Sequence, residues 1–380
     1  MRRYLTAALL MGAMALFTGC ADSNGQYVDL ESIEIEADVD LPEEDAGYDG
    51  KLYYDSTLWN ISYNGRYIYG GDLFWYTVDM SRNTYSVMCA RVGCDHFHDD
   101  RCELRERRSG IRYYDGGVLY VKEDSLYYRS SYGQIKKLHT NIYSTEFSRN
   151  NYPVTDDEPW APREIYQLIF LNEKELLIFA SNYVYTYNLE SKRAGEPIEI
   201  CDSIVFGACV NGNEVYSYNM NGEAYLTSLV DGTSKRILEQ GRGIKLLNGR
   251  LWYAVWAGGV PQIRSNNVEL TDERVEVENG SIQFTAFDEG VIYIGDSDAV
   301  MLHTFDGEDR ELLSSDELTY TLGNADYEYI CAGISSSLYI DGKLYVLSAW
   351  NGYSEDAFDS DFAYVWHCVE NGEITELTEE

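Results

Sequence analysis

The stretch NGRLWY at residues 248–253 is one of seven copies of a short unit that decides the fold. Each copy opens with Asn or Asp, six copies place Gly one or two residues later, and all end in apolar or aromatic residues. The other copies are NGRYIY (64–69), DGGVLY (115–120), NEKELLIF (172–179), NGNEVY (211–216), DEGVIY (288–293) and DGKLY (341–345). Because Asn-Gly and Asp-Gly tolerate positive φ, each copy predicts a tight hairpin followed by a strand.

The copies recur at intervals of 37 to 57 residues between equivalent apolar positions. Many continue into a second short strand and another turn, as EAYL (223–226) does before Asp231-Gly232. This pattern is typical of propeller blades, since one such sheet cannot bury both of its faces without neighbours. We therefore expect an all-β chain with a β-propeller of about seven blades over residues 51–380. A pair of β-sandwiches does not account for a recurrence of this period.

The composition agrees with a fold made of strands. The chain holds 34 Tyr, 12 Phe and 7 Trp, residue types that favour pleated and half-buried surfaces. No long stretch places apolar residues at the three-and-four spacing of an amphipathic helix.

The first 20 residues, MRRYLTAALLMGAMALFTGC, predict an export signal. Arg2 and Arg3 precede an apolar run over residues 5–17, which is shorter than the roughly 20 residues of a membrane-spanning helix. The run leads into LFTGC (16–20), which resembles a bacterial lipobox, whose cysteine thiol receives the lipid. We predict a lipoprotein signal over residues 1–19 and lipidation of Cys20, with an ordinary secretory signal as the alternative. Two or more acyl chains anchor a protein stably, so the membrane is an expected partner and the localisation extracytoplasmic.

Residues 20–50 are predicted to be a lipidated cysteine followed by an acidic tether. Residues 21–50 hold eleven Asp or Glu and no Lys or Arg, too little apolar mass to form a core. The whole chain carries a net charge of −35. This charge repels phosphate backbones and argues against a nucleic-acid partner.

A cysteine-rich segment follows the first copy of the unit. Cys89, Cys94 and Cys102, with His96 and His98, place three thiols and two imidazoles within 14 residues. Such a set is sufficient for a structural Cys₃His zinc site, because Zn²⁺ binds thiolates and imidazoles tetrahedrally. A disulfide that leaves one thiol over, or three free thiols, are alternatives that the spacing leaves open.

These residues resemble a known family. Uncharacterised β-propeller lipoproteins of Gram-positive anaerobic bacteria carry a segment L-C-x-x-P-x-C-x-H and a third cysteine, after an opening Y-I-Y strand. The match covers 67–69 and then Cys89, Cys94, His96 and Cys102; Met88 and Val92 replace the Leu and Pro, and one extra residue with His98 precedes Cys102. The family has no firm activity, so the resemblance implies a propeller fold and a membrane-anchored location.

The remaining cysteines allow further disulfides in an exported chain. Cys201 with Cys209, and Cys331 with Cys368, are the candidate pairs.

No motif for a known catalytic site is present: the sequence has no G-x-S-x-G elbow, no H-E-x-x-H and no phosphate-binding glycine loop. Two loops with aromatic residues are candidate ligand sites, one with Trp256 before Gly258-Gly259 and one with Trp350 and Tyr353. Their aromatic rings suit stacking on sugars or anchoring a peptide, and packing between blades is the alternative role for the tryptophans.

We expect the chain to be a lipid-anchored binding or scaffold module, and not an enzyme, for a peptide, protein or glycan. A carbohydrate-active enzyme with a site at the propeller axis is one alternative, and an accessory component of a membrane complex is another. Carboxyl groups with raised pKa at the axis would favour the enzyme, and an exposed apolar patch on one rim would favour a partner protein.

Overall fold

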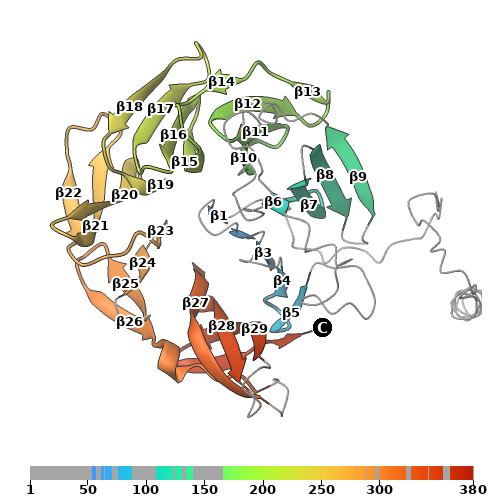
Figure 1. Ribbon diagram of the computed structural model, residues 1–380, viewed down its shortest axis with the longest axis vertical. Helices are drawn as coiled ribbons and strands as arrows, with labels where there is room; N and C mark the ends of the chain where they lie inside the picture. Colours follow the sequence, from blue (N-terminus) through green and yellow to red (C-terminus); the bar gives the residue numbers. More distant parts are fainter. Residues whose placement is uncertain are drawn as a thin grey trace, which may run out of the picture. The chain divides into compact units, whose positions relative to one another are not determined.

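Seven antiparallel sheets, each containing one copy of the repeated unit, are arranged in a ring (Figure 1). The chain is therefore an all-β, seven-bladed β-propeller, as the sequence predicts. The computed structural model describes residues 54–56, 61–63, 65–70, 76–87, 108–122, 125–130, 134–139, 166–287, 289–295, 299–321, 327–340, 342–353 and 360–379. All of them belong to the compact unit Tyr48–Glu380. Among these residues no helix is long and apolar enough to span a membrane. The predicted signal, Cys20 and the tether lie outside the described residues.

The blades follow one another along the chain. Blade 1 holds β1 (Tyr54–Ser56), β2 (Ile61–Tyr63), β3 (Tyr67–Gly70), β4 (Tyr76–Asp79) and β5 (Thr84–Val87). Blade 2 holds β6 (Arg108–Tyr114), β7 (Gly117–Lys122), β8 (Ser125–Ser130) and β9 (Ile135–His139). Blade 3 holds β10 (Tyr166–Asn172), β11 (Glu175–Ala180), β12 (Tyr183–Asn188), β13 (Arg193–Ala194) and β14 (Ile198–Glu199). Blade 4 holds β15 (Val205–Asn211), β16 (Glu214–Asn219), β17 (Ala224–Ser228) and β18 (Ser234–Leu238).

The last three blades have the same plan. Blade 5 holds β19 (Arg242–Leu247), β20 (Arg250–Ala257), β21 (Val260–Asn267) and β22 (Arg274–Val277). Blade 6 holds β23 (Phe284–Phe287), β24 (Gly290–Ile294), β25 (Val300–Thr304) and β26 (Asp309–Leu313), and the short 3₁₀ helix η2 (Ser315–Glu317) follows it. Blade 7 holds β27 (Glu328–Ile340), β28 (Lys343–Tyr353), β29 (Ser360–Glu370) and β30 (Glu373–Glu376).

The repeated unit forms the same element in every blade. Its turn joins the inner strand to the next strand outward, and its apolar run forms that next strand: β3, β7, β11, β16, β20, β24 and β28. In blade 5 both turn residues have positive φ, 51° at Asn248 and 71° at Gly249. The Asn-Gly pairs thus act as the hairpin turns that their sequence predicts.

The hydrophobic core lies between neighbouring blades. Tyrosines occupy much of the space between blades 7, 1 and 2, where the rings of Tyr69 and Tyr113 stack at 5.4 Å between centroids. Tyr76 of blade 1 meets Trp366 of blade 7 edge to face at 6.4 Å, and Trp366 is fully buried. The high tyrosine content therefore serves the contacts between blades.

The C-terminus closes the ring. After β30 the amide of Leu377 still donates to the carbonyl of Trp366 in blade 7, at 2.9 Å. The amide of the next residue, Thr378, donates to the carbonyl of Asn83 in blade 1, at 3.2 Å. β31 (Thr378–Glu379) then pairs in parallel with β5 as the outermost strand of blade 1. The chain crosses between the first and last blades within these two residues, and the side chain of Leu377 is fully buried at the crossing.

Candidate interaction face

The antiparallel blades give the ring two distinct faces. On one face the inner strands begin and the next strands outward end, so this face carries the connections between blades; we call it the linker face. The opposite face carries the turns of the repeated unit and the outermost turn of each blade; we call it the hairpin face. Loops on a rigid scaffold of this kind are where binding residues gather in β-proteins.

Exposed large apolar side chains are concentrated on the linker face. Six of the ten described residues of this kind lie there, on blades 4, 5 and 7: Phe206, Met220, Trp256, Val260, Ile330 and Tyr353. The other four, Ile135, Val230, Val275 and Phe305, lie at hairpin-face turns or on outermost strands. Single exposed apolar residues are ordinary on a protein surface, but a group on one face is typical of an interaction site.

Blade 5 presents one of the aromatic residues singled out from the sequence. Trp256 is the penultimate residue of β20 and is 50% exposed, and Val260 opens β21. Gly258 and Gly259 between them have φ of 63° and 91°, and a Cβ on either glycine would meet no atom within 4 Å. The turn between the two strands consists of these two glycines, which have no side chains to cover the indole of Trp256. The indole is therefore exposed to solvent.

Blade 7 extends beyond the length of the other blades. Its strands β27, β28 and β29 have 13, 11 and 11 residues, and their added length lies on the linker face. Tyr353 and Ile330 on this extension are 53% and 56% exposed.

Trp350 is buried, although the sequence placed it with Tyr353 in a candidate ligand-binding loop. The side chain is only 4% exposed, and its indole N–H donates to Ser348 Oγ at 2.8 Å. Its ring packs within the apolar cluster between blades 6 and 7, with the ring of Tyr320 at 5.9 Å. Of the two roles that the sequence left open for the tryptophans, Trp350 therefore has the packing role.

Blade 4 contributes residues that the sequence analysis missed. Phe206 lies at a bulge near the start of β15, and Met220 follows the end of β16 with its amide bonded to the carbonyl of Ile204 at 2.9 Å. Both side chains are about 40% exposed, at 39% and 43%. A large apolar residue inside an Asn-Met-Asn-Gly turn is a recognisable signal, but assigning it to a face requires the strand order.

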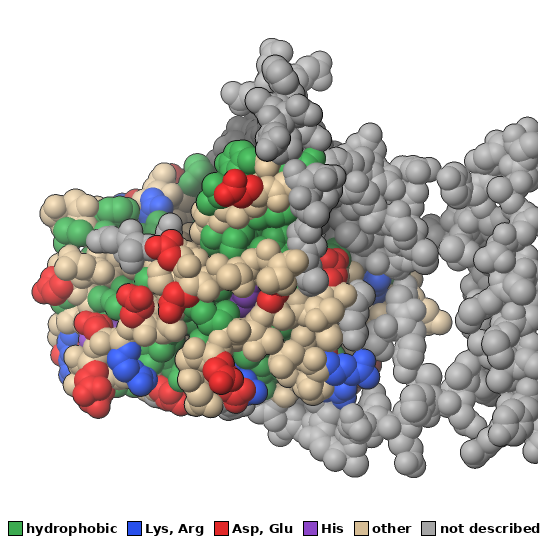
Figure 2. Space-filling model, turned by 90° about the horizontal axis from the view of Figure 1, so that it is seen from below, with side chains coloured by type: hydrophobic (Ala, Val, Ile, Leu, Met, Phe, Trp, Pro, Cys, Tyr) green, Lys and Arg blue, Asp and Glu red, His purple; other side chains and the backbone are tan. Residues whose placement is uncertain are grey.

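Five of the seven described connections on the linker face carry acidic residues. The seven connections are residues 181–182, 200–204, 220–223, 239–241, 258–259, 278–283 and 314–321. Together they hold six carboxylates, Asp202, Glu223, Glu239, Glu278, Asp316 and Glu317, and no Lys or Arg. Figure 2, an edge-on view, shows hydrophobic side chains gathered toward one rim and Lys and Arg side chains mostly toward the other.

The cysteine segment connects to the same face. Cys89, Cys94, His96, His98 and Cys102 all lie outside the described residues, so zinc and disulfide remain alternatives there. The strands on either side, β5 and β6, end and begin on the linker face.

The four described cysteines are free thiols, which corrects the proposed pairing of Cys201 with Cys209 and of Cys331 with Cys368. Cys331 lies opposite Trp350 on the blade 7 extension, whereas Cys368 lies opposite Tyr345, far along the same sheet. Burial raises the pKa of the Cys201 thiol to about 11 and that of Cys209 to about 12. A thiol with so high a pKa is a poor nucleophile and serves here as a packing group.

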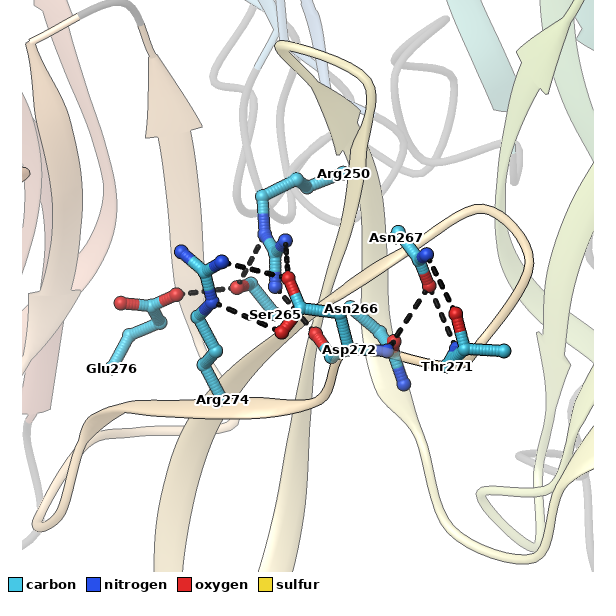
Figure 3. A network of polar contacts seen from close by, with 8 residues as sticks. All are labelled: Arg250, Ser265, Asn266, Asn267, Thr271, Asp272, Arg274 and Glu276. Atoms are coloured by element: carbon cyan, nitrogen blue, oxygen red, sulfur yellow. Dashed lines mark hydrogen bonds and ion pairs between the residues drawn. The ribbon is translucent and has the colours of Figure 1, made fainter.

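A network of polar contacts lies at the hairpin face, on blade 5 (Figure 3). Arg250 donates to Asp272 Oδ2 at 2.8 Å and to the Asp272 carbonyl at 2.7 Å, and Arg274 donates to the same carboxylate at 2.7 Å. Hydrogen bonds from these two guanidinium groups lower the pKa of Asp272. The amide of Asp272 in turn donates to Asn266 Oδ1 at 2.9 Å. Because its groups satisfy one another, this network is a structural clasp for the loop 268–273.

The described recesses are small. One groove of about 280 Å³ lies between blades 3 and 4, beside Tyr185 and Val230. Another of about 210 Å³ lies on blade 1, beside Asp79 and Tyr85. Pockets for drug-sized ligands usually span roughly 300–1,000 Å³. Both of these grooves are smaller than such pockets.

The chain was compared with known families, curated proteins and solved structures, and only solved structures match. No protein-family model and no curated protein matches the chain. Among solved structures, the computationally designed Ika8 protein aligns with a TM-score of 0.47 and 10% identity, over 84% of this chain and 95% of that one. BamB from Moraxella catarrhalis aligns with a TM-score of 0.42 and 8% identity, over 81% and 79%. The extracellular domain of the putative one-component system BT4673 from B. thetaiotaomicron aligns with a TM-score of 0.42 and 10% identity, over 67% and 33%.

Proposed function

We propose that this chain is a lipid-anchored, extracytoplasmic propeller that binds a protein partner through its linker face. The observation that carries the proposal is the group of exposed apolar side chains on that one face. Exposed Trp and Tyr support it further, since these residues are enriched at the energetic centres of protein interfaces. The partner presents apolar side chains bordered by Lys or Arg, because the described connections on the linker face carry six carboxylates and no Lys or Arg.

The described carboxyl groups with a shifted pKa do not suit the acid role of a glycosidase. Glycosidases need an acid whose pKa is raised, so that it keeps its proton near neutral pH. Within the described residues, the five carboxyl groups with a resolved shift all have a lowered pKa: Asp79, Glu223, Asp231, Asp272 and Asp306. These five therefore act as hydrogen-bond acceptors in turns and ion pairs.

The membrane anchor is tested by Cys20→Ser. Without the thiol no diacylglycerol is transferred, so we expect the variant to leave the membrane fraction or to retain its signal. The measurement is metabolic labelling with a fatty acid together with cell fractionation. Labelling and fractionation like those of the unaltered protein would contradict the lipid anchor.

The interaction face is tested by photo-cross-linking in the producing cell, with a photoreactive amino acid at position 256 or 353 of the exported protein. Positions 230 and 305 are matched controls, because Val230 and Phe305 are also exposed but lie at the hairpin face. We expect one adduct of the same mass from 256 and 353 and none from the controls. Protease should degrade the attached partner, and its cross-linked peptide should carry Lys or Arg near the reacting apolar residue.

Ile330→Glu serves as a disrupting variant in the same assay. A charge within the apolar group should reduce the adduct yield at least tenfold, which corresponds to about 1.4 kcal/mol of binding free energy. Adducts of equal yield from both faces would refute the linker face as the site. An adduct sensitive to glycosidase and resistant to protease would identify a glycan ligand in place of a protein.

A further inference from the structure

A strap crosses blade 7 on the linker face. We use this name for residues 314–321, which lead from β26 toward β27 and contain η2. At its far end, the amide and hydroxyl of Thr321 donate to Glu376 Oε2 on β30, at 2.8 and 2.9 Å. The ring of Tyr320 lies edge to face against Tyr329 on β27, at 4.8 Å between centroids. The strap therefore contacts both the innermost and the outermost strand of the blade.

A buried histidine holds the middle of the strap. His367 on β29 is fully buried, and its Nε2 lies 2.9 Å from the carbonyl oxygen of Thr319. A carbonyl can only accept a hydrogen bond, so Nε2 carries the hydrogen and Nδ1 of the neutral ring is the acceptor. The Nδ1 partner is Ser348 Oγ at 3.3 Å. Ser348 Oγ also accepts from the indole of Trp350 at 2.8 Å, and its hydroxyl donates to the carbonyl of Val365 at 3.1 Å.

A second proton on the His367 ring does not break these hydrogen bonds. The Ser348 hydroxyl already donates to Val365, so a proton on Nδ1 meets Ser348 Oγ as an acceptor. The positive charge itself is the difficulty, because the ring is surrounded by apolar and neutral groups from β28, β29 and the strap. Glu376, its cross-strand neighbour on β30, is the one described charged group that acts on it. Burial outweighs this carboxylate and the Thr319 carbonyl, so the pKa of His367 is lowered from its ordinary 6.5.

We propose that His367 is an acid-sensitive pin, and that its protonation releases the strap from the linker-face end of blade 7. The strap packs against the same extension that presents Ile330 and Tyr353, with Tyr320 between Tyr329 and the buried Trp350. Release therefore rearranges part of the interaction face. The consequence for partner binding rests on the proposed function, whereas the release itself does not.

The direction with pH follows from the lowered pKa. A solvent-exposed histidine in the open form titrates near 6.5, so the open form binds more protons than the closed form below that pH. The contribution of His367 to strap closure is fully present above about pH 6.5 and is lost as the pH falls below it. The opening equilibrium constant increases by at most about tenfold per pH unit, until the pH reaches the pKa of the closed form.

The experiment is hydrogen exchange of the strap amides in the full-length protein at about pH 7.5 and about pH 5, corrected for intrinsic exchange rates. We expect opening of the strap to increase about tenfold or more on acidification of the unaltered protein. His367→Gln keeps a side-chain amide that donates to Thr319 but does not titrate, so its opening should be the same at both pH values. His303→Gln, on blade 6, should retain the pH response.

The same pH response in His367→Gln as in the unaltered protein would refute the pin. If that variant fails to fold, the unaltered protein still decides the question. The connections 200–204 and 278–283, which contain no histidine, should show no comparable increase, and an equal increase there would refute the proposal. Strap release together with an unchanged cross-link from position 353 would refute the consequence for partner binding and leave the release itself standing.

Discussion

Removal of the four residues after Glu376 is expected to lower the free energy of unfolding by about 4 kcal/mol, because it opens the ring at its only crossing in the described strands. The truncation removes the fully buried Leu377 and the pairing of β31 with β5. Truncating a buried leucine alone costs about 3–5 kcal/mol when the surrounding atoms cannot collapse into the cavity. Urea unfolding monitored by tryptophan fluorescence measures the change.

Two single substitutions separate the components of this effect. Leu377→Ala keeps the backbone pairing and should account for most of the loss, about 3 kcal/mol. Thr378→Ala changes only an exposed side chain on β31 and should alter stability by less than about 0.5 kcal/mol. Equal and small effects of the truncation and of Thr378→Ala would show that the ring does not depend on its C-terminal crossing.

Gly290→Ala is expected to cost about 3 kcal/mol, a large effect for the addition of one methyl group. A Cβ at this position would lie 2.2 Å from the carbonyl oxygen of His303 and 3.0 Å from Thr304 Cα. Both atoms belong to the backbone of β25, the neighbouring strand of blade 6, so relief requires a strand to move. Gly117 meets the same obstacle at the carbonyl of Arg129 in blade 2.

Gly249→Ala is the matched control, since it places the same methyl group at a turn of the same repeated unit. No atom lies within 4 Å of that Cβ, but φ is 71°, which a non-glycine residue adopts at a cost of about 1 kcal/mol. Thermal and urea unfolding of the two variants should therefore rank Gly290→Ala well below Gly249→Ala. A reversed order would mean that turn strain, and not strand contact, limits these positions.

The repeated unit predicted the fold because each copy is a short stretch of sequence that forms a turn and the strand after it. The turn of every copy is followed by a strand, as at Asn248 and Gly249, where both residues have positive φ, and seven copies indicated the blade number. The ring closure had no such signal. β31 is two residues long, and nothing in the sequence Thr378-Glu379 indicates that it pairs in parallel with a strand almost 300 residues earlier.

The candidate site was predictable only in part. Trp256 and Tyr353 are exposed as their loops suggested, but Trp350, three residues from Tyr353, is buried by a strap from another part of the chain. Phe206 and Ile330 lie within strands, where exposure depends on which neighbours cover the sheet. The number of cysteines in the chain made a disulfide between Cys331 and Cys368 plausible, but the strand register places them far apart along the sheet and excludes it.

The pairing of β31 with β5 also affects whether copies of this protein can pair with one another through their edge strands. A propeller leaves one edge of each outermost strand without a partner, and such edges are templates for pairing with another chain. Blade 1 covers its edge with β31. The outermost strands of the other blades carry charges that make pairing costly: Lys136 and Lys137 on β9, Arg193 on β13, Glu199 on β14, Lys235 and Arg236 on β18, Arg274 and Glu276 on β22, Asp309 and Glu311 on β26, and Glu373 on β30. The proposed lipid anchor would confine copies of the protein to a thin layer at high local concentration. Charged edges of this kind would keep neighbouring rings from merging into continuous sheets while leaving the linker face available.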